Sequence, residues 1–230
     1  MAEPVRLRPG IRLVLDFDST IVRVESLDEL AALALQKHPN RKALLKAIQT
    51  TTRLGMQGTL PFDVSLCRRL ALFTPTREHI RRLVPILRRR VSRSFHKNRA
   101  FFRRYGNRIH ILSGGFKEYI IPVVRPYGIP ARNIHANSFL FDEKGCVRGF
   151  DASNPLASRR GKVKALKSLR LRGKIIAVGD GYSDYELKRA GLVDRFFAYT
   201  ESVRRRAVTA HADGEAHDFD EIIRVLREEL

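Results

Sequence analysis

Short apolar runs along the chain predict the strands of a parallel sheet. Residues 11–17 form a run rich in branched apolar side chains, which is typical of a strand buried on both faces. Similar runs occur at residues 108–112 and 174–178, and shorter ones at residues 133–136 and 196–199. From the second run onwards, strand and helix patterns alternate as βαβ units require. We therefore predict an α/β fold with a Rossmann-like parallel sheet flanked by helices.

A helical pattern interrupts this alternation after the first strand. Ser26 followed by Glu29 is a capping-box signature, and apolar residues recur after it at helical spacing. Further helices are indicated around residues 41–51, from about Thr76, and on a face formed by Phe62, Leu66, Leu70 and Phe73. About four helices without a strand between them predict an inserted small helical-bundle cap, residues 24–92, within an α/β core formed by residues 1–23 and 93–230.

Three later segments carry more specific signals. Phenylalanines and a valine on either side of the turn at residues 142–145 predict a hairpin. The helix after Phe116 contains Pro122 and Pro126, each of which removes a backbone donor, so an irregular or broken helix is expected. Asp218 is expected to cap a last amphipathic helix.

Composition limits the class of protein. The 230 residues fit one domain, or one domain with an insertion, and 43% hydrophobic with 30% charged residues is ordinary for a globular protein. No apolar run approaches the roughly 20 residues of a membrane helix, so no membrane partner is expected. The N-terminal residues lack the pattern of a secretory signal, and the two cysteines are too few for a disulfide framework. A cytoplasmic protein is expected.

The net charge of +20 is the unusual feature of the composition. Such a field attracts polyanions, anionic membranes and phosphorylated small molecules alike. Residues 79–117 contain no Asp or Glu and many Arg, but no aromatic stacking array or nucleic-acid motif accompanies them. We interpret this stretch as a solvated basic surface and expect no specific nucleic-acid partner, only weak and salt-sensitive contact.

Three predicted strands end in residues suited to phosphate chemistry. Asp16 and Asp18 follow the first strand, and Ser113 with Gly114 follows the strand at 108–112, where a hydroxyl and backbone N–H groups can cradle a phosphate. Gly179 to Asp184 follows the strand at 174–178, where carboxylates suit a hard cation such as Mg²⁺. Ligands bind at the carboxyl ends of parallel strands, so these groups are expected to meet at one edge of the sheet.

These motifs resemble those of the haloacid dehalogenase superfamily of phosphohydrolases and, within it, the phosphoserine phosphatase family. The resemblance implies that Asp16 is the nucleophile that accepts the phosphoryl group, and that Asp18 protonates the leaving oxygen and then activates water. It also implies that Asp16, the backbone carbonyl of Asp18 and Asp180 hold Mg²⁺, with Asp184 supporting the site. A small phosphorylated molecule is the implied partner, and hydrolysis of O-phosphoserine the implied reaction.

The superfamily's third motif is a cation near the start of a helix, and residues 158–166 offer Arg160 or Lys162. Apolar residues lie three, four and seven positions after Lys162, whereas two of those positions after Arg160 are lysines. Lys162 is therefore preferred as the catalytic and phosphate-binding cation, although either residue could neutralise phosphate.

Five further residues carry the resemblance to substrate recognition. Glu25 matches an acid that contacts the substrate ammonium, and Arg69 an arginine that clamps its carboxylate. Met56 and Phe62 match the apolar lining. Ser183 stands where many of these phosphatases have Asn, so the resemblance does not carry over that amide's phosphate contact, although the hydroxyl can still donate one hydrogen bond.

Two alternatives use the same residues. The first is a phosphotransferase, or a phosphatase of the superfamily that acts on another small phosphorylated amino acid or amino alcohol. The second is a basic binding module with vestigial acids, against which the complete acid set argues.

Overall fold

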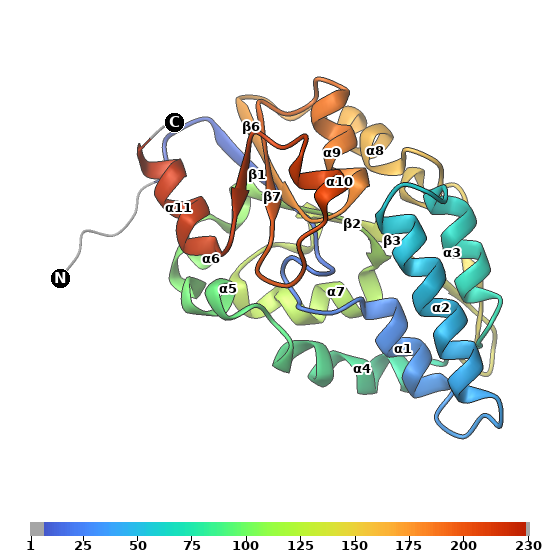
Figure 1. Ribbon diagram of the computed structural model, residues 1–230. Helices are drawn as coiled ribbons and strands as arrows, with labels where there is room; N and C mark the ends of the chain where they lie inside the picture. The colour runs from blue at the N-terminus through green and yellow to red at the C-terminus, as the bar shows by residue number, and fades with distance from the viewer. Residues whose placement is uncertain (1–6, 229–230) are drawn as a thin grey trace.

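A computed structural model describes residues 7–228 and contains a six-stranded parallel sheet (Figure 1). The strand order is β3-β2-β1-β6-β7-β8, so the chain builds outwards from β1 first on one side and then on the other. The predicted α/β class is therefore confirmed, and a ligand crevice is expected beside β1, where the order reverses. The strands are β1 (Ile11–Leu15), β2 (Ile109–Phe116), β3 (Ile134–Asn137), β6 (Lys174–Gly179), β7 (Arg195–Tyr199) and β8 (Gly214–Ala216).

Successive apolar side chains of β1 point to opposite faces of the sheet, and helices cover both faces. Leu13 and Leu15 belong to one buried cluster, whereas Val14 belongs to the other. The first face is covered by α5 (Arg93–Lys97), α6 (Arg99–Tyr105), α7 (Lys117–Val124) and α11 (Phe219–Glu228), and the second by α8 (Gly161–Leu169), α9 (Tyr182–Arg189) and α10 (Arg206–Thr209). Short 3₁₀ turns occupy Gly106–Arg108, Arg125–Tyr127, Ala131–Asn133 and Pro155–Ala157.

Four helices lie between β1 and the segment that leads to β2: α1 (Ser26–Ala34), α2 (Arg41–Met56), α3 (Phe62–Leu70) and α4 (Arg77–Arg89). They stand beside the sheet at the edge formed by its carboxyl ends (Figure 1). The chain enters and leaves this helical module at one place, because Val22 and Val91 form an antiparallel bridge and Ser92 N donates to Ile21 O at 2.8 Å. The division into a core of residues 1–23 and 93–230 and a cap of residues 24–92 stays a prediction.

Several local predictions are confirmed. The hairpin is β4 (Phe139–Phe141) with β5 (Val147–Phe150). The helix that contains Pro122 gives way to a 3₁₀ turn after Val124. Asp218 accepts a hydrogen bond from Glu221 N at 2.9 Å and so caps α11. Among residues 7–228, no helix is long and apolar enough to cross a bilayer.

Two boundaries differ from the prediction. The strand expected at 108–112 continues to Phe116 with a shift of register, so Ser113 and Gly114 lie in its last part and not in a turn. The helix α1 begins at Ser26, one residue earlier than predicted, so its N-cap is Glu25 and not Ser26. The N–H of Ser26 donates a hydrogen bond to Asp18 Oδ1 at 3.0 Å. A side chain at the end of β1 thus anchors the first helix of the module.

Two histidines on neighbouring strands predict sensitivity to acid. His110 Nδ1 lies 3.2 Å from His135 Nε2, and the rings are nearly parallel. Burial, with a lesser effect of His135 and Arg12, lowers the pKa of His110 to about 4, and burial also lowers that of His135. As the pH falls, these histidines are protonated in the unfolded chain before they are protonated in the folded protein. Their contribution to the free energy of unfolding is therefore fully present above about pH 6.5 and is lost as the pH falls towards 4.

Replacing His110 with asparagine should remove part of this loss. Between pH 7 and pH 5, the wild type should lose about 1 kcal/mol more unfolding free energy than the variant. Urea unfolding at the two pH values measures it, with the exposed His38→Asn as the matched control. Equal losses in the wild type and the His110 variant would contradict the assignment.

Candidate active site

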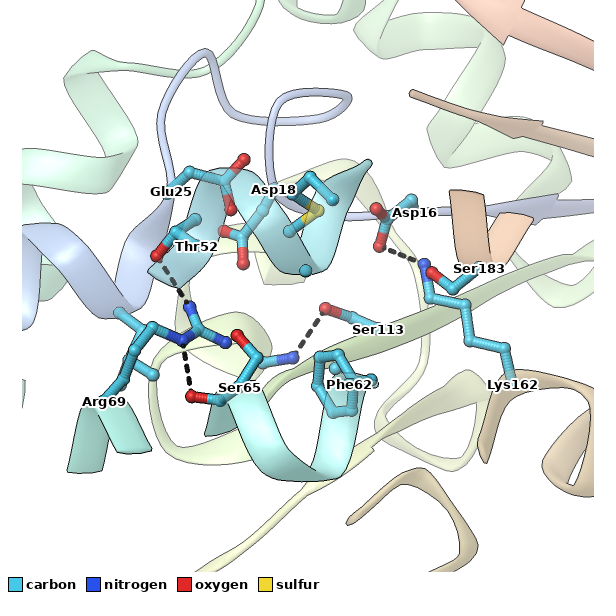
Figure 2. Close-up of a pocket in the computed structure, with 15 residues that line it drawn as sticks. Asp16, Asp18, Glu25, Thr52, Phe62, Ser65, Arg69, Ser113, Lys162 and Ser183 are labelled. Atoms are coloured by element: carbon cyan, nitrogen blue, oxygen red, sulfur yellow. Dashed lines mark hydrogen bonds and ion pairs between the residues drawn. The ribbon is translucent and has the colours of Figure 1, made fainter. Parts of the chain in front are cut away.

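A pocket at the carboxyl ends of β1 and β2 gathers most of the predicted site residues (Figure 2). It lies between the sheet edge and the helical module, and the first residues of α8 and of α9 complete it. Residues more than 140 positions apart in the sequence meet here. The predicted residues that line the pocket are Asp16, Asp18, Glu25, Met56, Phe62, Arg69, Ser113, Gly114, Lys162 and Ser183, while Asp180 and Asp184 lie next to Asp16.

Three buried carboxylates stand together beside this pocket. Single oxygens of Asp16, Asp180 and Asp184 lie within 4.8 Å of one another. Burial, the largest cause, raises the pKa of Asp184 to about 7 and that of Asp180 well above its usual range. Such a cluster is costly without positive charge, and an oxygen-only donor set suits a hard divalent cation. The chemistry of these residues therefore fits a metal ion.

Lys162 supplies positive charge from the second residue of α8. Its Nζ lies 2.8 Å from Asp16 Oδ1 and 2.7 Å from Asp184 Oδ1. Burial opposes its charge, but Asp16 and then Asp184 outweigh burial and raise the pKa of Lys162. The side chain of Arg160 pairs with a different residue: its Nε lies 3.7 Å from Glu186 Oε1, and the side chain is half exposed. The structure thus brings Lys162, and not Arg160, to the acid cluster.

Glycines in the strand ends allow these close approaches. A Cβ at Gly179 would lie 2.3 Å from Asp184 Cγ, so a side chain there would push Asp184 out of the cluster. A Cβ at Gly114 would lie 2.3 Å from the tip of the Phe62 ring. The helical module therefore reaches the end of β2 only because position 114 has no side chain. The neighbouring Ser113 Oγ accepts a hydrogen bond from Gly115 N at 3.0 Å.

Asp18 lies close to Asp16 but in a different environment. Burial first, and then repulsion from Glu25, raises the pKa of Asp18 well above its ordinary value, although the hydrogen bond from Ser26 opposes this. A carboxyl group whose pKa is raised holds its proton more readily and can donate it to a leaving oxygen. The site thus offers, side by side, a carboxylate paired with Lys162 and a carboxyl group suited to proton transfer.

Arg69 is a buried side chain of α3 whose guanidinium faces the pocket (Figure 2). Its Nε donates to Ser65 O at 3.3 Å and its Nη1 to Thr52 Oγ1 at 3.2 Å. Thr52 in turn donates to Asp28 at 2.7 Å, and Asp28 lies 3.9 Å from Arg69 Nη1. Sequence reasoning missed these three supporting residues, because their local patterns are those of ordinary helix positions.

Glu25 and Arg205 form a second charged pair at the pocket. Glu25 Oε1 accepts from Ser19 Oγ at 2.8 Å and lies 3.5 Å from Arg205 Nη2. The Nη1 of Arg205 donates to Asp180 Oδ2. Sequence reasoning missed Arg205, which is the middle one of three consecutive arginines in a basic chain and has no local signal that distinguishes it.

Comparison with known families fits this geometry. The family model for haloacid dehalogenase-like hydrolases matches residues 13–189, a span that includes the acid cluster, Lys162 and the helical module. The chain therefore belongs to the haloacid dehalogenase-like hydrolase family.

Several relatives match this chain over most of its length. The chain is 34% identical to the phosphoserine phosphatase of Homo sapiens over 224 residues, which cover 93% of this chain and 92% of that protein. It is 33% identical over 214 residues to the chloroplastic phosphoserine phosphatase of Arabidopsis thaliana, covering 92% and 70%. The crystal structure of a phosphoserine phosphohydrolase-like protein from Francisella tularensis aligns with a TM-score of 0.83 at 32% identity, covering 93% and 98%.

Proposed function

We propose that this protein is a phosphoserine phosphatase, a phosphoric monoester hydrolase that converts O-phosphoserine and water to serine and phosphate with the help of Mg²⁺. The observation that carries the proposal is one pocket that holds a carboxylate paired with a lysine and, across from them, a second carboxylate and a buried guanidinium. Asp16 with Lys162 lies on one side, and Glu25 with Arg69 lies on the other (Figure 2). The relatives in the phosphoserine phosphatase family support the same reaction.

In the first half-reaction, a carboxylate oxygen of Asp16 attacks phosphorus and the bond from phosphorus to the serine oxygen breaks. The proton of Asp18 passes to that leaving oxygen, so serine departs neutral at its hydroxyl. Lys162, the Ser113 hydroxyl and the Gly114 N–H would stabilise the charge on the phosphoryl oxygens, and all three residues line the pocket. When bound by Asp16, Asp180 and the Asp18 carbonyl, Mg²⁺ neutralises the repulsion between carboxylate and phosphate.

In the second half-reaction, Asp18 accepts a proton from water as the water oxygen attacks phosphorus. The bond between phosphorus and Asp16 breaks, phosphate leaves, and Asp18 has its proton again. One residue thus serves as acid and then as base, which requires a carboxyl group whose pKa is raised towards neutrality. Burial raises the pKa of Asp18, which is the direction that this dual role needs.

Substrate recognition follows from the charges on the other side of the pocket. The carboxylate of Glu25 is suited to the ammonium of phosphoserine, and the fork of the Arg69 guanidinium to its carboxylate. Met56 and Phe62 provide apolar contacts, and Ser183 offers a hydroxyl at the phosphate side. A zwitterionic substrate is therefore matched group by group.

Phosphate release from a panel of substrates tests the proposal. Phosphoserine should be hydrolysed at least 30-fold better, by kcat/KM, than phosphoethanolamine, phosphocholine or glucose 6-phosphate, since none of these has the carboxylate. Chelation of Mg²⁺ should stop turnover, and addition of free alcohols should show whether the phosphoryl group passes to an acceptor other than water. A preference for any substrate without an amino-acid moiety would contradict the assignment.

A further inference from the structure

Arg205 extends from the loop after β7 to Asp180 of the acid cluster and to Glu25 of the pocket. Its Nη1 donates to Asp180 Oδ2, and its Nη2 lies 3.5 Å from Glu25 Oε1. Only 16% of the side chain is exposed, so these ion pairs are weakly screened by water. One guanidinium thus joins a carboxylate assigned above to the cation and a carboxylate assigned to the substrate ammonium.

The fold holds the loop that carries Arg205 on both sides. Glu201 accepts hydrogen bonds from Ser92 Oγ at 2.8 Å and from Arg93 N at 3.0 Å. Arg204 makes two hydrogen bonds to Glu215, at 2.8 and 2.7 Å. These contacts fix the backbone at residue 205 close to the pocket, so its side chain is directed there by the fold.

The contacts of Arg205 involve the same oxygens that the ligands need. Asp180 Oδ1 accepts from Thr20 Oγ1 at 3.4 Å and Oδ2 accepts from Arg205, so both oxygens of Asp180 have partners. A divalent cation and a guanidinium are both positive and compete for Oδ2. Of the two contacts of Arg205, the one with Glu25 is the looser, because Glu25 Oε1 lies 3.5 Å from Arg205 Nη2 and also accepts a hydrogen bond from Ser19 Oγ at 2.8 Å. Asp180 is therefore the main anchor of the guanidinium.

We propose that Arg205 is a positioning residue that competes with Mg²⁺ for Asp180 and with the substrate ammonium for Glu25, so that binding of either ligand favours binding of the other. The inference rests on the proposed function. A cation on Asp180 removes the main anchor of Arg205 and repels its charge, and Glu25 becomes available to an ammonium. Arg205 itself lines an open groove of about 640 Å³, together with neutral side chains such as Gln49 and Gln57 and with Arg53, Arg204 and Arg206, so the side chain has room to move away from Asp180.

Binding of Mg²⁺ measured by calorimetry without substrate tests the first competition. Both Arg205→Ala and Arg205→Gln should bind Mg²⁺ about 5- to 100-fold more tightly than wild type, the range typical of coupled sites. The matched control is Arg206→Ala, which removes one charge from the adjacent exposed position and should change the affinity less than twofold. Equal or weaker Mg²⁺ binding in a folded Arg205 variant would overturn the proposal.

Binding of the product serine, with and without Mg²⁺, tests the second competition. Mg²⁺ should tighten serine binding about 5-fold or more in the wild type and in Arg206→Ala, and by less than twofold in the Arg205 variants. Persistence of the wild-type coupling in those variants would overturn the proposal. Thermal melting checks folding, and Arg205→Gln keeps most of the side-chain volume in case Arg205→Ala unfolds. Failure of the wild type to hydrolyse phosphoserine would overturn the proposed function instead, while the substrate-free Mg²⁺ titration still decides the competition at Asp180.

Discussion

Replacing Asp16 with asparagine is expected to lower the turnover of phosphoserine by about 10⁴-fold or more. The amide has nearly the volume of the carboxylate but no anionic oxygen that can attack phosphorus, so no covalent intermediate forms. Lys162 keeps its contact with Asp184 at 2.7 Å, and Asp16 lies at the end of a strand whose backbone hydrogen bonds do not depend on the side chain. Phosphate release by the purified variant measures the loss, and a melting curve shows that the fold remains.

The matched control is Asp18→Asn, the same change two residues away. It should slow both half-reactions, because the amide can neither give nor take the proton. Acid quenching with labelled phosphoserine separates the two variants, since label should be recovered on Asp16 in the Asp18 variant and nowhere in the Asp16 variant. Covalent label in Asp16→Asn protein, or substantial turnover by it, would refute the nucleophile.

Replacing Arg69 with alanine is expected to lower kcat/KM for phosphoserine by a factor of about 30 to several thousand, or about 2–5 kcal/mol. Arg69 is 4% exposed, and its guanidinium is oriented by Thr52 and by the Ser65 carbonyl, so a substrate carboxylate would meet it with little water between them. The value for phosphoethanolamine should change little, because that substrate has no carboxylate for Arg69 to hold.

Two further variants sharpen this test. Arg68→Ala removes the neighbouring exposed arginine of the same helix and should leave both substrates unaffected. Arg69→Lys should recover little, because one ammonium cannot reproduce a two-point contact. If Arg69→Ala lowers kcat/KM for both substrates equally, the arginine does not bind the carboxylate and the phosphoserine assignment fails, whereas the chemistry at Asp16 does not depend on this result.

The sheet and its reactive edge could be predicted because their signals are local. Each central strand is a short apolar run that ends in an acid, a glycine or a serine, and parallel topology brings those ends together. Lys162 could be distinguished from Arg160 by the apolar residues that follow it. The structure places that lysine against Asp16, although the two residues are far apart in the sequence.

Other features had no local signal. α5 and α6 have five and seven residues, too few for a helical period to be recognised among arginines, and β8 has three. Glu25 and Arg69 were found by resemblance alone, since one arginine among 44 basic residues looks like any other. Arg205 is defined only by tertiary contacts with Asp180 and Glu25, which lie 25 and 180 positions away.

The bridge between Val22 and Val91 has a consequence for how this chain can be rebuilt. The two ends of the intervening segment are neighbours, so a graft of quite different length could be spliced between them without stretching the strands on either side. Whatever was grafted there would sit above Asp16 and Lys162 and would decide which molecules reach them. With the roles proposed above, the reacting groups lie outside this segment and Glu25, Met56, Phe62 and Arg69 lie within it, so exchange of one contiguous segment is a route to new substrates for the same reaction.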